Sequence, residues 1–177
     1  MVILNSNGKC INRTVVLDVE TTGLSPEHGD RIIEVGAVAL QGNLVIDEFH
    51  SLICVDRTIH PDAERIHGIT KYMLCGQPKA EYVFPKFHRF IEGSVLVAHY
   101  AAFDLSFIAH EFGRFKLDLR QPYLCTLALG RKMFPELDRH DLGSLYRHLY
   151  NSAPEILHRA LEDAEVAAKI WVKFNQL

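Results

Sequence analysis

Cysteine is scarce in this sequence: its four cysteines, Cys10, Cys54, Cys75 and Cys125, are scattered and include no C-x-x-C pair. This spacing excludes a small disulfide-built scaffold and favours reduced thiols in a cytoplasmic protein. The apolar start of the chain turns polar at Asn5 and has no basic lead, so no signal peptide is expected. No apolar run approaches the roughly 20 residues that span a bilayer, and we expect no membrane partner.

Motifs that would indicate other chemistries are missing as well. The sequence has neither G-x-x-x-x-G-K nor G-x-G-x-x-G, which excludes a Gly-rich loop that cradles a nucleotide. His110 and Glu111 begin an H-E pair, but Arg114 stands where a zinc-binding H-E-x-x-H helix needs its second histidine. A zinc hydrolase is therefore disfavoured.

Positive charge is not in excess, since 19 Lys and Arg against 22 Asp and Glu give a net charge of −3. This balance argues against a general nucleic-acid coat protein. Residues 1–80 contain 7 basic and 10 acidic residues, whereas residues 81–177 contain 12 of each. An apolar content of 48% and a length of 177 residues suit one globular domain over residues 1–177.

The hydrophobic pattern changes its period along the chain. Strands are expected at 13–20, 31–40, 44–54, 94–99 and 122–126, and helices at 61–67, 79–92, 103–115, 126–133, 141–150 and 159–174. Three strands joined by short turns, followed by alternating strands and helices, predict an α/β fold with a mixed sheet covered by helices.

Two acids, Asp18 and Glu20, stand where the first apolar strand ends. Because side chains alternate along a strand, both carboxylates point the same way and repel each other unless a cation lies between them. Two acids at a frayed, solvated strand end are the plainer interpretation. The segment 21–23, which follows at once, favours a ligand site, because it supplies hydroxyls, backbone N–H groups and a glycine beside the acids.

Asp163 falls on the apolar face of the last predicted helix. At about 100° per residue it lies at about 300° from Ala160, between Ile170 at about 280° and Phe174 at about 320°. An unpaired buried carboxylate costs several kcal/mol, so it must be paired, hydrogen-bonded or bound to a metal. A buried Asp that caps a backbone element is the alternative.

Asp104 repeats this pattern more weakly on the helix predicted at 103–115. Its apolar face also contains Glu111, and an acid in a first helical turn is favoured by the helix dipole without any ligand. Four acids on three elements favour Mg²⁺ or Mn²⁺, which take oxygen ligands. His158 could accept a proton from water at the same site, although a surface or satisfied histidine is equally compatible with its spacing.

Three segments together resemble the signature motifs of the DEDD exonuclease superfamily, in its histidine subgroup: DVETTG at 18–23, VAHYAAFDLSF at 97–107 and HRALEDA at 158–164. IHGIT at 66–70 resembles a further segment common there. ALGRKMFP at 128–135 resembles the epsilon proofreading subunits of bacterial DNA polymerase III.

The resemblance implies a ribonuclease H-like fold with a five-stranded mixed sheet, and 3′→5′ removal of nucleoside monophosphates with two Mg²⁺ or Mn²⁺ ions. Asp18 would bridge both ions, and Glu20 and Asp163 would hold the ion that carries the attacking water. Asp104 would support the second ion, and His158 would be the general base. The implied substrate-binding residues are Thr21, Thr22, Gly23, Leu24, His67, Asp62 and Phe103. For Phe103, core packing is the plainer role.

The sequence departs from the family pattern after His99, where Tyr100 replaces the usual Asn. That Asn helps to order the loop and the nearby substrate, so the change bears on substrate affinity and preference more than on catalysis. The Pro-Glu-Ala common ahead of HGI reads Pro61-Asp62-Ala63 here, which weakens the assignment of Asp62.

The sequence thus predicts a metal-dependent 3′→5′ exonuclease of the proofreading or repair type in the bacterial cytoplasm. Its substrate would be a single-stranded or frayed DNA 3′ end, with DNA favoured over RNA, and a DNA polymerase would be a further partner. Three alternatives stay open. They are an exoribonuclease or oligonucleotide nuclease on the same scaffold, a non-catalytic interaction module, and a subunit that works only within a polymerase complex.

Overall fold

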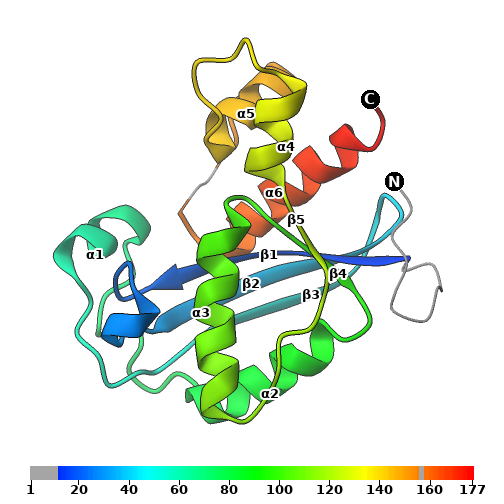
Figure 1. Cartoon of the computed structure of the whole chain (residues 1–177). Coiled ribbons are helices and arrows are strands. Elements are labelled where there is room, and N and C mark those ends of the chain that lie inside the picture. The colour runs from blue at the N-terminus through cyan, green and yellow to red at the C-terminus, as the bar shows by residue number, and fades with distance from the viewer. Residues whose placement is uncertain (1–11, 156–157) are drawn as a thin grey trace.

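One mixed sheet organises the computed structural model, which describes residues 12–155 and 158–177 (Figure 1). In this part of the chain the strands are β1 (Arg13–Thr21), β2 (Ile32–Gln41), β3 (Leu44–Leu52), β4 (Val95–Ala98) and β5 (Tyr123–Cys125). They lie in the order β3-β2-β1-β4-β5. The pairs β1–β2 and β2–β3 are antiparallel, whereas β1–β4 and β4–β5 are parallel, which confirms the predicted mixed sheet of five strands.

The helices follow the predicted order, with ends shifted by one or two residues. They are α1 (Pro61–His67), α2 (Ala80–Phe90), α3 (Ala101–Arg114), α4 (Thr126–Met133), α5 (Leu142–Tyr150) and α6 (Ala160–Phe174). A short 3₁₀ helix, η1 (Pro26–His28), was not anticipated. None of the described helices has both the length and the apolar character needed to cross a membrane.

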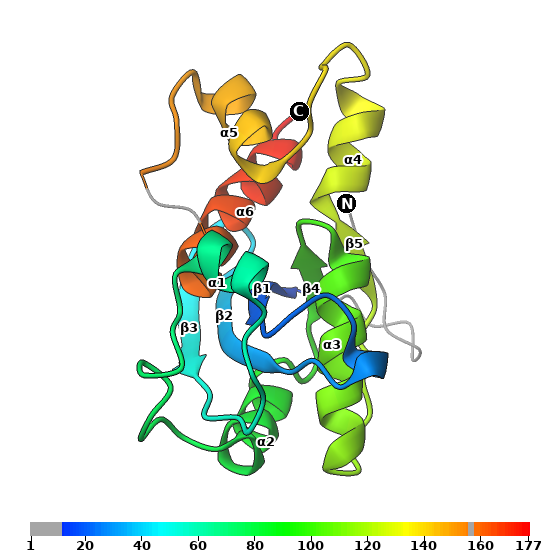
Figure 2. The same cartoon turned by 90° about the vertical axis from the view of Figure 1, so that its left-hand side faces the viewer.

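The central strand β1 separates two apolar layers. Its odd-numbered residues, including Val15 and Leu17, pack with α2 and α3, whereas Val16 packs with α6 on the opposite face. Figure 2 shows α2 and α6 on opposite sides of the sheet. By alternation Asp18 and Glu20 lie on the α6 face, so the two acids are directed toward the helix that carries the third.

The first turn of α6 lies directly on β2 at Gly36. A Cβ atom at Gly36 would stand 2.2 Å from the backbone nitrogen of Leu161 and 2.3 Å from the carbonyl carbon of Ala160. Gly36 pairs with Asp18 across the β1–β2 ladder. The absence of a side chain at Gly36 therefore lets the start of α6 approach the strand pair beside the acids.

We expect Gly36→Ala to lower the free energy of unfolding by about 1–3 kcal/mol or more, because the new methyl group must push α6 from the sheet. Gly113→Ala in α3 is the matched control, since a Cβ there meets nothing within 4 Å. This control should raise stability by up to about 1 kcal/mol. Urea unfolding followed by circular dichroism measures both variants. A Gly36→Ala protein as stable as the parent would contradict the close contact.

Candidate active site

Carboxylates from β1 and α6 meet at the end of β1. One oxygen each from Asp18, Glu20 and Asp163 lies within 4.8 Å of the other two. Asp163 is 8% exposed, although it lies in the first turn of α6 among apolar neighbours. The structure therefore brings Asp163 to Asp18 and Glu20, although Asp18 and Asp163 are 145 positions apart in the sequence.

The fourth predicted acid, Asp104, lies in the first turn of α3 and is 2% exposed. Its negative charge acts on Asp18, and that of Asp163 acts on Asp104. Hydrogen bonds from the backbone of Val19 and from its own backbone partly satisfy its carboxylate. Asp104 thus borders the cluster from the α3 side.

Burial raises the pKa values of all four acids, and repulsion from other acids of the cluster adds to this effect for Asp18, Glu20 and Asp104. Burial raises the pKa of Asp18 well above its ordinary value, and the charges of Asp104 and Glu20 add to this effect. Burial also raises the pKa of Glu20 and of Asp104 to about 8 each, and that of Asp163 to about 6. Without a bound cation, the four groups cannot all be ionised at neutral pH.

The carboxylate of Glu34 behaves differently because it is already neutralised. Glu34 is fully buried and pairs across the ladder with Glu20. The guanidinium of Arg159 donates hydrogen bonds of 2.6 to 3.2 Å to both of its oxygens, and the N–H of Ala160 adds one of 3.1 Å. His50 lies 2.8 Å away on β3. The hydrogen bonds from Arg159 and His50 outweigh burial and lower the pKa of Glu34.

Sequence reasoning missed this network, although a signal was present. Glu34 interrupts the strand Ile32–Gln41, whose other inward positions are apolar or glycine. Arg159 sits one residue before α6 and directly follows His158. Arg159 is paired with Glu34, so its charge has little effect on Glu20. It lowers the pKa of Glu20 by less than burial and the neighbouring acids raise it.

His158 connects to the cluster through its backbone. Its N–H donates to both oxygens of Asp163 at 3.2 Å each. Its φ of 72° lies in the left-handed region, which is uncommon for residues other than glycine and frequent at functional sites. The exposed side chain of His158 therefore stands on a constrained turn directly before α6.

Local hydrogen bonds hold the predicted substrate-binding segment Thr21–Leu24, which begins at the last residue of β1. The hydroxyl of Thr21 donates to the carbonyl of Gly23 at 2.6 Å, and that of Thr22 donates to Asp30 at 3.2 Å. Leu24 follows with 84% of its surface exposed. A ring nitrogen of buried His67 lies 3.3 Å from the carbonyl oxygen of Thr21, which ties α1 to the segment.

The two remaining predicted residues lie differently. Asp62 is exposed and pairs with Arg65 of its own helix, α1. Phe103 is half-buried, and the centroid of its ring lies 5.0 Å from that of Phe107 in the core. Both therefore have ordinary structural partners.

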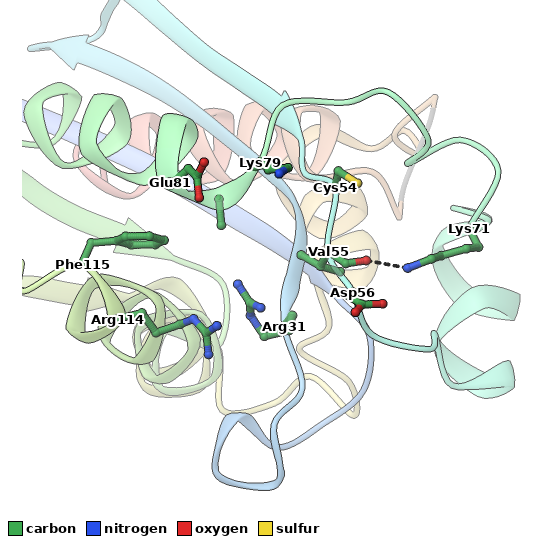
Figure 3. Close-up of a pocket in the computed structure, with 10 residues that line it drawn as sticks. Arg31, Cys54, Val55, Asp56, Lys71, Lys79, Glu81, Arg114 and Phe115 are labelled. Carbon is green, nitrogen blue, oxygen red and sulfur yellow. Dashed lines mark hydrogen bonds between the residues drawn. The ribbon is translucent and has the colours of Figure 1, made fainter.

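A cavity of about 480 Å³ opens at the other end of α3 (Figure 3). Its lining contains Arg31, Lys71, Lys79 and Arg114 but none of the four clustered acids. Arg31 is bound to Glu111, and the ammonium of Lys71 donates to the carbonyl of Val55 at 2.5 Å. The cavity is therefore separate from the acidic cluster, and two of its four cations already have partners.

Comparison with known proteins shows which family the chain resembles. The family model described as Exonuclease (RNase_T) matches residues 15–171. The chain is 42% identical over 164 residues to the PolC-type DNA polymerase III of Thermotoga maritima. The aligned region covers 92% of this chain and 12% of that polymerase. It is 34% identical over 160 residues to the DNA polymerase III subunit epsilon of Aquifex aeolicus. That alignment covers 90% of this chain and 78% of the subunit.

A solved structure gives the same result. Exonuclease X in complex with 5′ overhanging duplex DNA matches with a TM-score of 0.73 and 28% identity, over 92% of this chain and 91% of that chain. The resemblance seen in the three motifs and the predicted fold class are confirmed. Since the family model spans nearly all of the sequence, the chain belongs to the exonuclease family.

Proposed function

We propose that the chain is a divalent-metal-dependent 3′→5′ exonuclease that releases nucleoside 5′-monophosphates from single-stranded or frayed DNA 3′ ends. The observation that supports this proposal most is the convergence of Asp18, Glu20 and Asp163, whose oxygens lie within 4.8 Å of one another. Ligand atoms on opposite sides of one Mg²⁺ are about 4 Å apart, so this oxygen set suits a hard cation.

Asp18, Glu20, Asp163 and Asp104 would hold two Mg²⁺ or Mn²⁺ ions. Such ions lower the pKa of water and stabilise the attacking and leaving oxygens of a phosphodiester displacement. They also reverse the sign of the local charge, so an acidic site in a chain of net charge −3 can accept a polyanion. Both effects account for a buried acid cluster in a nuclease.

The other residues bind, orient and move a proton. The segment Thr21–Leu24, tied down by His67, would receive the terminal nucleotide. His158 would accept the proton of the attacking water from its exposed position beside Asp163. Arg159 would act through its ion pair with Glu34, which fastens the turn that carries His158 to β2.

DNA is the proposed substrate because the relatives are DNA polymerase III proteins and the matching structure contains duplex DNA. The same relatives support a DNA polymerase as partner and the cytoplasm as location. Hydrolysis of matched 5′-labelled single-stranded DNA, duplex DNA and RNA, each with and without Mn²⁺, tests the substrate. Faster digestion of the RNA would reassign the chain as an exoribonuclease.

Removing one ligand charge should abolish hydrolysis. We expect Asp18→Asn or Asp163→Asn to lower the rate about a thousandfold or more, since the ions contribute several kcal/mol to the transition state. Excess EDTA should have the same effect. Glu165→Gln, two residues after Asp163 on the same helix, is the control and should keep the parental rate. Parental turnover in EDTA would refute the metal-dependent mechanism.

The metal-free protein should become less stable as the pH rises. The folded pKa values of Glu20, Asp104 and Asp163 (about 8, about 8 and about 6) exceed the unfolded values near 4, so unfolding releases protons over this window. The contribution of these three acids to the free energy of unfolding therefore decreases as pH rises from about 4 to about 8. Burial lowers the pKa of His99 to about 4 and also lowers that of His67, which opposes this trend below about 6.5, but the three acids outnumber the two histidines. Melting temperatures in EDTA should show this decline, and Mn²⁺ should flatten it by binding the folded state. If the melting temperature of the metal-free protein stays constant or rises across this range, the raised pKa values of the clustered acids would be contradicted.

The Glu34–Arg159 pair should affect both stability and rate. Breaking a buried pair costs up to about 3–5 kcal/mol, and loss of a residue that orients a metal ligand lowers activity about 10- to 100-fold. Glu34→Gln should show both losses. Glu111→Gln is the matched control. It also breaks a buried ion pair, that of Glu111 with Arg31, and the side chain of Glu111 is only 2% exposed. It should lose stability and keep its kcat, which urea unfolding and steady-state kinetics will measure. Equal losses of kcat in the two variants would reduce Glu34 to a purely structural residue.

A further inference from the structure

Tyr100 combines an unfavourable backbone with an exposed ring. It lies between β4 and α3 with φ 75° and ψ 47°, in the left-handed region. Asn and Gly adopt this conformation readily, whereas a large side chain disfavours it. The position is also where the family pattern usually has Asn. Yet the side chain of Tyr100 remains 58% exposed, so burial compensates little for the conformation.

The contacts of the Tyr100 ring are aromatic. It stacks on Phe103 with 6.5 Å between ring centroids and 11° between planes. Phe103 in turn lies 5.0 Å from Phe107, which is fully buried. Tyr100 is therefore the outermost member of a row of rings that is rooted in the core, and its partner holds it in a defined orientation.

This row ends beside the acid cluster. Tyr100 precedes Asp104 by four residues, about one helical turn or 6 Å along α3. Asp104 is buried and interacts electrostatically with both Asp18 and Asp163. The backbone of Tyr100 thus lies at the N-terminal end of α3, one turn from an acid of the site where the 3′ end of a strand would be cleaved.

We propose that Tyr100, supported by Phe103, is a stacking platform for an unpaired nucleobase near the 3′ end of the bound strand. Every base has an aromatic face, so the platform accepts any sequence, as an exonuclease on single strands requires. Ligand binding then gives a reason for a strained tyrosine at a position where asparagine would fit with less strain. The location of the platform rests on the proposed function, whereas the stacking itself can be measured without hydrolysis.

The test is equilibrium binding of fluorescein-labelled oligothymidylate in Ca²⁺, followed by anisotropy. A second oligonucleotide has the same backbone but lacks the bases of its last three nucleotides. Base–aromatic stacking corresponds to about a 5- to 150-fold change in affinity. We expect Tyr100→Asn to weaken binding of the intact strand within this range and to bind the abasic strand as the parent does. Tyr100→Phe should bind both strands like the parent.

Two controls separate stacking from folding. Tyr100→Asn relieves the backbone strain, so its melting temperature should equal or exceed that of the parent. Tyr72→Asn removes a tyrosine that is 89% exposed in a turn far along the chain and should leave binding unchanged. An equal loss of affinity for the intact and abasic strands, or no loss for either, would overturn the proposal.

The binding assay also separates this proposal from the nuclease assignment. A parent protein that discriminates intact from abasic strands through Tyr100, but does not digest DNA in Mn²⁺, would retain the platform and refute the exonuclease. A parent that digests DNA, with Tyr100→Asn binding both strands normally, would retain the exonuclease and refute the platform.

Discussion

Repulsion among four clustered carboxylates limits how this chain can fold. Asp18, Glu20, Asp104 and Asp163 share one patch at the end of β1, and burial raises the pKa of each. An arrangement of this kind works against folding unless the charges are neutralised. The fold tolerates it because other contacts, above all apolar packing, hold β1, α3 and α6 in place.

Part of this attachment is made at the start of α6. Gly36 leaves space for the first turn of the helix, and Glu34 binds both the side chain of Arg159 and the N–H of Ala160. The same few residues therefore place Asp163 beside β1 and fix the turn that carries His158. One buried acid is fully satisfied so that its neighbours can remain available to a ligand.

The two kinds of acid in the strand pair illustrate how environment assigns roles. Glu20 and Glu34 are opposite each other in the β1–β2 ladder, yet the pKa of Glu20 is raised to about 8 and that of Glu34 is lowered. The difference comes from partners, because Arg159 and His50 reach Glu34. A sequence pattern alone would have treated both as acids in strands.

The order of the elements, the mixed sheet and the acids that stand against the apolar pattern could all be predicted from the sequence. Hydrophobic period and helix angle are local properties, so Asp163 could be recognised on its helix face without a structure. The three motifs added the family, which the comparisons confirm. Which distant groups meet was visible only in the folded chain. There Arg159 pairs with Glu34, Gly36 lies under α6, and Tyr100 has a left-handed backbone and stacks on Phe103. Such pairings depend on how strands register and helices dock, and these are set by contacts between residues far apart in the chain, which no local pattern encodes.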